Sequence, residues 1–161
     1  MSTTRVPFVC NYISLVVLRP SARGHEVLLL ERTGETMHGE WCQIAGGIEP
    51  GELAWETVLR EMKEETQLVP ERLYSADILE QFYEPDRNRI SVVPVFVAFV
   101  PEGTEPTLNE EHSAWQWVSV EEARRLVPFP GQAEMLEKVR QYFLATTPSE
   151  LLRIPLPSPA G

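Results

Sequence analysis

The chain has 161 residues and a formal net charge of −10, from 14 basic and 24 acidic residues. This length fits one domain with a substantial core, and 43% apolar and 24% charged residues are typical of a globular protein. The acidic balance argues against a nucleic-acid-binding protein, because no basic stripe is available to displace counterions from phosphates. A small anionic ligand remains compatible with this charge, provided that a cation bridges the two.

The sequence contains no candidate membrane span, because no stretch approaches the ~20 apolar residues that a spanning helix needs. The apolar N-terminal run contains Pro7 and Asn11 and lacks a small-residue cleavage site, so it predicts a strand rather than a signal peptide. Cys10 and Cys42 form no CxxC pair and are predicted to be reduced thiols in the core. We therefore expect a cytoplasmic protein with no membrane partner.

The first half of the chain predicts a β-hairpin followed by a loop and a helix. Two β-rich runs, 11–20 and 25–32, flank a glycine-containing turn. A short strand at 40–46 then enters the glycine pair Gly46-Gly47, and the turn signal at 50–51 precedes a helix from about Glu52 to Gln67. This helix must end before Pro70, which cannot continue it.

The second half predicts three more strands and a final helix. Strands are expected at 72–84, 90–100 and 114–120, then a short helical turn at 120–127 and an amphipathic helix at 132–145. Strands interspersed with helices indicate an α/β fold, with a mixed sheet sandwiched between helices. We expect a single domain over 1–145 and a proline-rich surface tail over 146–161.

The helix at 52–67 carries three crowded carboxylates, Glu61, Glu64 and Glu65. On a wheel of about 100° per residue, its apolar residues occupy an arc of roughly 140°, and the three carboxylates occupy an overlapping arc of roughly 100°. Glu65 projects inside the apolar side, and Glu61 lies at its edge. The apolar residues of this face are Ala54, Trp55, Val58, Leu59 and Met62.

Partial burial of ionised carboxylates is unfavourable unless a cation or hydrogen-bond donors compensate. Arg60 is one internal candidate, but one guanidinium cannot neutralise three carboxylates. Oxygen-rich sites suit Mg²⁺ or Mn²⁺, so the pattern favours a divalent metal site. The alternative is an exposed acidic helix with i,i+4 ion pairs, without a ligand.

The loop and helix together resemble the Nudix box, the signature of hydrolases of nucleoside diphosphates linked to another moiety. The matching residues are Gly46, Glu52 with seven residues between it and Arg60, and the run from Arg60 through Glu61, Glu64 and Glu65, with apolar Met62 and Leu68. One position departs from the pattern, because Gln67 replaces the glycine that normally ends the helix in a left-handed conformation.

The resemblance implies an α/β/α sandwich and a role for each matching residue. Glu61, Glu64 and Glu65 would bind Mg²⁺, or Mn²⁺, with a backbone carbonyl near Ala45. Arg60 would orient the carboxylates. Glu52 would brace the loop that carries Gly46 and Gly47. The implied reaction is attack of water on a phosphorus of a pyrophosphate.

The implied substrate is a small nucleotide or related phosphate anhydride. The segments Glu111–Trp117 and Asp86–Arg89 are similar to segments of bacterial dATP and dihydroneopterin triphosphate pyrophosphohydrolases, so a triphosphate is preferred. ADP-ribose or another nucleoside diphosphate derivative is the alternative. A catalytically silent nucleotide sensor and a purely structural domain are the rival classes. Nudix proteins are often dimers, but nothing in the sequence fixes an interface.

Several residues outside the box remain open candidates. Glu110 or Glu111 resembles a loop acid that adds a metal ligand or the general base in several members, and we favour Glu111. Trp117 shares a strand face with Trp115, where core packing is preferred over a border of the base pocket. The histidines show no ligand spacing and are not expected to bind metal. The arginines that could contact phosphates, or lie simply at the surface, are Arg32 and Arg87 or Arg89.

Overall fold

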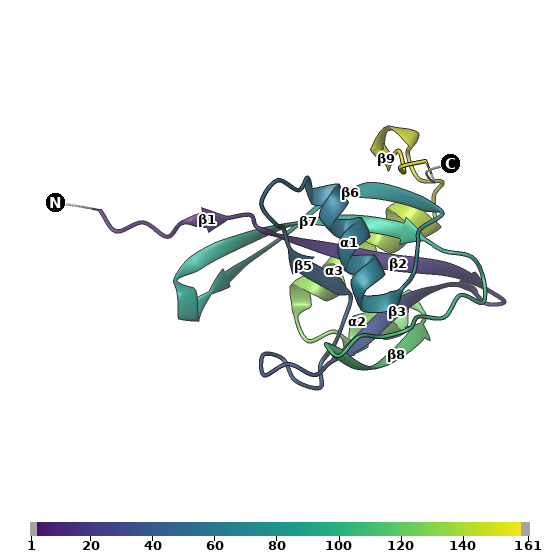
Figure 1. The fold of residues 1–161 in the computed structure, drawn as a ribbon, viewed down its shortest axis with the longest axis horizontal. Helices are drawn as coiled ribbons and strands as arrows, with labels where there is room; N and C mark the ends of the chain where they lie inside the picture. Colours follow the sequence, from purple (N-terminus) through teal and green to yellow (C-terminus); the bar gives the residue numbers. More distant parts are fainter. Residues whose placement is uncertain (1–2, 159–161) are drawn as a thin grey trace.

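The computed structural model describes residues 3–158, which form a mixed β-sheet between helices (Figure 1). The sheet has the order β4-β3-β2-β7-β6-β9, with β5 paired to β2, β8 to β3 and β1 to β7. β2 runs parallel to β7 and antiparallel to β3. The strands are β1 Phe8–Val9, β2 Tyr12–Ser21, β3 Gly24–Arg32, β4 Trp41–Cys42, β5 Ile44–Gly47, β6 Arg72–Glu84, β7 Arg89–Phe99, β8 His112–Val118 and β9 Arg153–Ile154.

One face of the sheet is covered by α1, Ala54–Thr66 (Figure 1). The apolar arc of this helix packs against buried residues of β2, β3 and β7, as the wheel predicted. Val58 and Met62 have no exposed surface. The packing of this apolar arc therefore fixes α1, and with it the carboxylates of the helix, against the sheet.

The other face is covered by α2, Val120–Leu126, and α3, Pro130–Val139, which continues as a π-helical turn over Arg140–Leu144. Their apolar residues form a second core cluster with alternate residues of β2, β3, β6 and β7. The α/β/α sandwich expected from the sequence is confirmed. The described helices include none that is long and apolar enough to span a bilayer.

The β6–β7 hairpin projects well beyond the sandwich (Figure 1). It ends in a 3₁₀ turn, Pro85–Arg87, and β1 pairs with β7 near this tip. Leu79, Phe82 and Tyr83 are all more than half exposed on this arm. The sequence predicted both strands, but not that their outer halves would leave the body of the molecule.

Three local features differ from the sequence-based expectations or refine them. Cys10 is exposed, so the prediction of two core thiols is wrong for this residue, whereas Cys42 is buried. The expected strand at 40–46 divides around Gln43, because β4 pairs with β3 and β5 pairs with β2. Part of the proline-rich segment is ordered, because a 3₁₀ turn at Glu150–Leu152 leads into β9, which pairs with β6.

Candidate active site

The loop before α1 lies directly against the carboxylates of the helix. β5 carries Gly46, where an added Cβ would overlap with the side chain of Glu61. The position therefore requires glycine for close approach rather than for an unusual backbone angle. This contact places the backbone of β5 directly beside the carboxylate of Glu61 on α1.

Arg60 makes four hydrogen bonds, two to the loop before α1 and two to carboxylates of its own helix. Its Nε donates to Glu52 Oε1 over 2.7 Å, and Nη2 donates to the carbonyl of Gly47 over 2.9 Å. Its Nη1 donates to Glu61 Oε1 over 2.9 Å and to Glu64 Oε2 over 3.3 Å. The guanidinium holds the pKa of Glu52 below its usual value, together with a hydrogen bond from Thr57. Arg60 thus orients two carboxylates of the site and braces the loop.

The three helix carboxylates differ in exposure. The Glu64 side chain is 55% exposed, the Glu61 side chain is 12% exposed, and Glu65 is almost completely buried. Burial raises the pKa of Glu61, although Arg60 opposes the shift. The prediction that Glu65 projects into the apolar side of the helix is confirmed.

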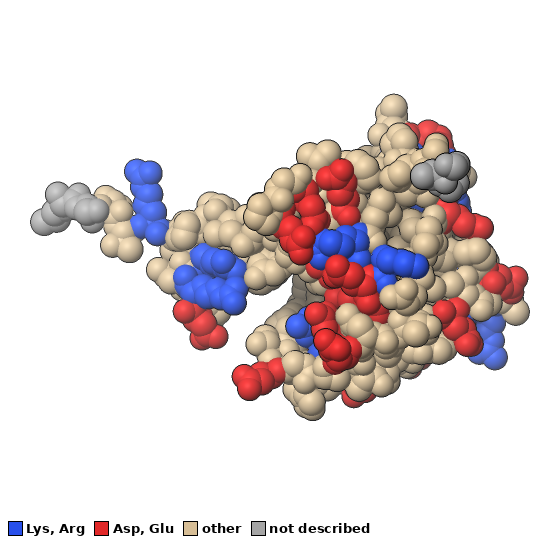
Figure 2. Space-filling model, viewed as in Figure 1, with Lys and Arg blue, Asp and Glu red and all other residues tan. Residues whose placement is uncertain are grey.

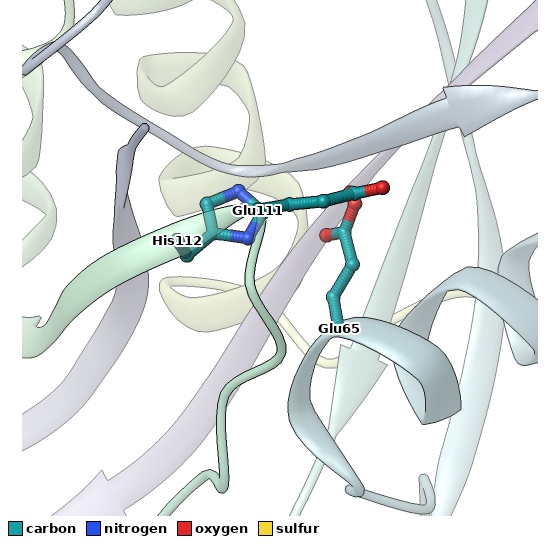
Figure 3. A group of neighbouring side chains, drawn as sticks. All are labelled: Glu65, Glu111 and His112. Atoms are coloured by element: carbon teal, nitrogen blue, oxygen red, sulfur yellow. The ribbon is translucent and has the colours of Figure 1, made fainter. Parts of the chain in front are cut away.

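Glu65 meets the loop that enters β8 (Figure 3). Ligand atoms of Glu65, Glu111 and His112 lie within 4.8 Å of one another, and the carboxylates of Glu65 and Glu111 point toward each other. Burial, followed by the charges of Glu61 and Glu111, raises the pKa of Glu65 to about 9. Within residues 3–158, no hydrogen-bond partner faces the buried Oε2 of Glu65. Without a cation, this group therefore favours its neutral form.

These residues fit a hard divalent cation. The donors are carboxylate oxygens from α1 and from the β8 loop, which is the donor set that Mg²⁺ and Mn²⁺ prefer. The orphaned Oε2 of Glu65 is the kind of buried acceptor that a metal ion satisfies. Acidic side chains gather over α1 on the surface around this point (Figure 2).

Comparison with known proteins identifies the family. The NUDIX domain model matches residues 12–141. The chain belongs to the Nudix family. Mouse bis(5'-nucleosyl)-tetraphosphatase [asymmetrical] is 33% identical over 129 residues, covering 77% of this chain and 84% of the relative. Nucleoside triphosphatase NudI of Escherichia coli is 31% identical over 93 residues, covering 52% and 64%. The solved structure of Caenorhabditis elegans Ap4A hydrolase in a binary complex has a TM-score of 0.72 at 26% identity, covering 83% and 97%.

This membership agrees with the Nudix box expected at Gly46 to Leu68 and makes the chain a hydrolase of phosphoric anhydride bonds. The departure at Gln67 leaves the Nudix turn intact. Gln67 adopts the left-handed conformation, with φ 59, and its N–H donates to the carbonyl of Lys63. A non-glycine residue therefore occupies a glycine geometry at the end of the Nudix helix.

Of the predicted phosphate contacts, the structure brings only Arg32 to the Nudix carboxylates. Arg32 ends β3, and its charge acts on Glu65 and Cys42. Its Nε is buried, and the part of the chain that the structure describes offers it no hydrogen-bond partner. Arg87 instead lies at the hairpin tip, paired with Glu84 at 3.4 Å.

Trp117 is partly buried and packs against the core cluster under α1. The guanidinium of Arg19 covers its ring at 4.3 Å from the ring centroid. Trp115 packs against the same cluster, so both rings contact the core, and a place for Trp117 at the border of a base pocket stays the alternative prediction.

Sequence reasoning missed His112, which was not expected near a metal. It lies beside Glu65 because β8 pairs with β3, an association between segments 80 residues apart that ligand spacing cannot reveal. Burial lowers the pKa of His112, which favours a neutral imidazole. The signal that could have indicated His112 is its place in the sequence, directly after the candidate metal ligand Glu111.

Proposed function

We propose that the protein is a Mg²⁺-dependent pyrophosphohydrolase that cleaves a nucleoside triphosphate to a monophosphate and pyrophosphate. Water oxygen bonds to phosphorus, the P–O bond to the departing phosphate group breaks, and a proton of the water passes to a base. The meeting of Glu65 with Glu111 and His112, close enough to Glu61 for its charge to act on Glu65, carries this proposal; Arg60 holds Glu61 and Glu64 on the same helix.

The chain's own residues divide the work of the reaction. Glu61, Glu64 and Glu65, with the carbonyl of Ala45, would hold the cation, and Arg60 keeps Glu61 and Glu64 in position. A bound Mg²⁺ supplies charge neutralisation for the phosphates and acidifies water. Glu111 is placed to add a ligand or to accept the proton, and Arg32 to contact a phosphate oxygen.

A dinucleoside tetraphosphate is the second candidate substrate. The similarity to mouse bis(5'-nucleosyl)-tetraphosphatase [asymmetrical] and to the C. elegans Ap4A hydrolase structure favours it. Both candidates share a polyphosphate chain and a nucleoside, so the same carboxylates serve either one. ADP-ribose and nucleotide sugars, and binding without cleavage, are the remaining alternatives.

Product analysis on a substrate panel tests the proposal. The panel contains (d)NTPs, dihydroneopterin triphosphate, dinucleoside tetraphosphates, ADP-ribose and nucleotide sugars, each with Mg²⁺ and with EDTA. The Glu64→Gln variant is the control for contaminating hydrolases. We expect Mg²⁺-dependent release of a monophosphate and pyrophosphate from a triphosphate. Cleavage confined to dinucleoside tetraphosphates would select the second candidate, and binding without cleavage of any compound would overturn the enzymatic proposal.

A further inference from the structure

A row of polar side chains crosses the sheet face that α2 and α3 cover. Gln43 Nε2 donates to Ser14 Oγ over 3.0 Å, and Gln132 Nε2 lies 3.5 Å from Gln43 Oε1. The hydroxyl of Ser14 also lies close enough to the carboxyl group of Glu80 to influence its pKa. Ser14 and Gln43 are buried, although the neighbouring positions on this face, such as Val16 and Val95, are apolar core. A buried polar row in an apolar layer is unfavourable unless its geometry serves a ligand or a specific fold.

Glu80 is the unusual member of this row. Glu84, four residues along the same strand, pairs with Arg89 at 3.1 Å and with Arg87 at 3.4 Å. Glu80 is half-buried beside Ser14, and among the described residues no basic side chain forms a salt bridge with it. Burial raises the pKa of Glu80, although the hydroxyl of Ser14 opposes the shift. A neutral carboxyl group offers one O–H donor and one carbonyl acceptor in the same plane.

β5 connects this row to the carboxylates of the Nudix helix. Gln43 immediately precedes β5, Ala45 pairs with Ser14, and Gly46 lies against Glu61. Gln43 and Gly46 are therefore separated by about 10 Å of extended chain. A notch in the surface opens beside β5, between the acidic surface over α1 and the projecting hairpin (Figure 2). A nucleotide with its phosphates at the carboxylates can direct its base along this strand toward Glu80.

We propose that Glu80 is a specificity-determining residue that, with Gln43, reads the hydrogen-bonding edge of the substrate's base. This inference rests on the proposed function and adds the base class to it. A donor beside an acceptor complements a ring nitrogen next to an exocyclic amino group, which adenine and cytosine present. In this proposal Glu80 carries a proton when the base binds, so the ring N–H that guanine and uracil present at this position would face an O–H and leave one donor unpaired. A mismatch of this kind reduces kcat/KM by about 10-fold to 100-fold.

Substitution of Glu80 tests the proposal by two routes. We would measure kcat/KM with Mg²⁺ for ATP against GTP, and for Ap4A against Gp4G, in the wild type, Glu80→Gln, Glu80→Ala and the exposed control Glu102→Gln. The amide of Glu80→Gln retains one donor and one acceptor, so the preference for adenine should persist. Glu80→Ala should reduce the preference at least about 10-fold, mainly through slower cleavage of the adenine compounds. Glu102→Gln should match the wild type.

A binding experiment separates failure of this inference from failure of the proposed function. AMP and GMP would be titrated by calorimetry into Glu64→Gln, with and without Glu80→Ala, after thermal unfolding has shown that each variant is folded. Tighter binding of AMP that disappears with Glu80→Ala supports the inference even if no compound on the panel is cleaved. An adenine-to-guanine ratio that Glu80→Ala leaves unchanged, or a wild-type preference for guanine or uracil, would overturn it.

Discussion

Arg60 Nε lies 2.7 Å from Glu52 Oε1, in an ion pair that ties the loop before α1 to the middle of the helix. The same guanidinium reaches the carbonyl of Gly47 and the carboxylate of Glu61. Loop position and carboxylate orientation therefore depend on one side chain. These contacts predict that Arg60 acts as a positioning residue rather than by touching the reacting phosphorus.

Replacement of Arg60 by alanine should lower both activity and stability. The loop loses its clamp, and Glu52 and Glu61 lose a cationic partner. We expect kcat to fall at least 10-fold and Tm to fall by about 2–4 °C or more, the shift that 1 kcal/mol produces in a domain of this size. Arg125→Ala is the matched control, because within residues 3–158 this exposed arginine forms a salt bridge with Glu121 of α2 alone. Unchanged rate and melting in Arg60→Ala would refute the positioning role.

Glu64→Gln and Glu65→Gln should each reduce turnover by several orders of magnitude while the protein stays folded. Each change removes a negative charge from the proposed metal site but keeps the size of the side chain. The expected loss is measured as kcat with saturating Mg²⁺, and folding is checked by thermal unfolding. Near-wild-type activity in either variant would exclude that residue as an essential metal ligand.

Glu110 and Glu111 provide a neighbouring pair for a controlled comparison. Glu111 reaches Glu65, whereas Glu110 is exposed and contributes its backbone carbonyl, which accepts a hydrogen bond from Thr33. Glu111→Gln should therefore lower kcat about 10²-fold or more, within the range for loss of a general base. Glu110→Gln should retain the wild-type rate. If the two substitutions lowered kcat equally, the assignment of Glu111 rather than Glu110 to the active site would be wrong.

The sequence predicted those parts of the site that are local in the chain. Helical periodicity alone placed Glu65 against the apolar side of α1, and burial of this residue confirms it. The approach of Glu111 and His112 depends on the pairing of β8 with β3, which local periodicity does not encode. The same limit applies to Arg32 and Arg87, because two arginines at loop edges look alike until the fold separates them.

The fold was predictable to a similar depth. The alternation of apolar residues gave the strands and the two layers of helices, since each element buries one face. The pairing of β9 with β6 was not predictable, because Ile154 stands alone between prolines and leucines without a periodic pattern. The projection of the β6–β7 hairpin was not predictable either. The residue pattern of a strand indicates which residues face a core, but not where along the strand the covering helices end.

Gln67→Gly should stabilise the protein. Gln67 has φ 59, where a side chain with a Cβ is disfavoured by about 1–2 kcal/mol relative to glycine. Part of this gain is offset by the larger entropy of glycine in the unfolded chain. We expect an increase of up to about 1 kcal/mol in the free energy of unfolding, measured by urea denaturation. Gln67→Ala keeps the Cβ and should show no such gain. If Gln67→Gly destabilised the protein, the idea that the Gln67 backbone is strained would be wrong.

The stability of the metal-free protein should depend on pH through Glu65. Burial and neighbouring charges raise the pKa of this residue to about 9 in the folded protein, from the ordinary value of 4.5 that it has when unfolded. Between these values the folded state binds one more proton than the unfolded state, so the stabilisation is complete below pH 4.5 and is lost as the pH rises toward 9. The slope is at most about 1.4 kcal/mol per pH unit.

Comparison of Glu65→Gln with the wild type in EDTA isolates this effect. The amide cannot ionise, so the variant should gain stability relative to the wild type as the pH rises from 6 to 9, in urea unfolding at each pH. The exposed control Glu134→Gln should retain the wild-type slope. Saturating Mg²⁺ should stabilise the wild type more at higher pH, because the cation binds the ionised carboxylate, and should stabilise Glu65→Gln much less. Parallel curves for Glu65→Gln and the wild type in EDTA would show that Glu65 is already ionised without metal.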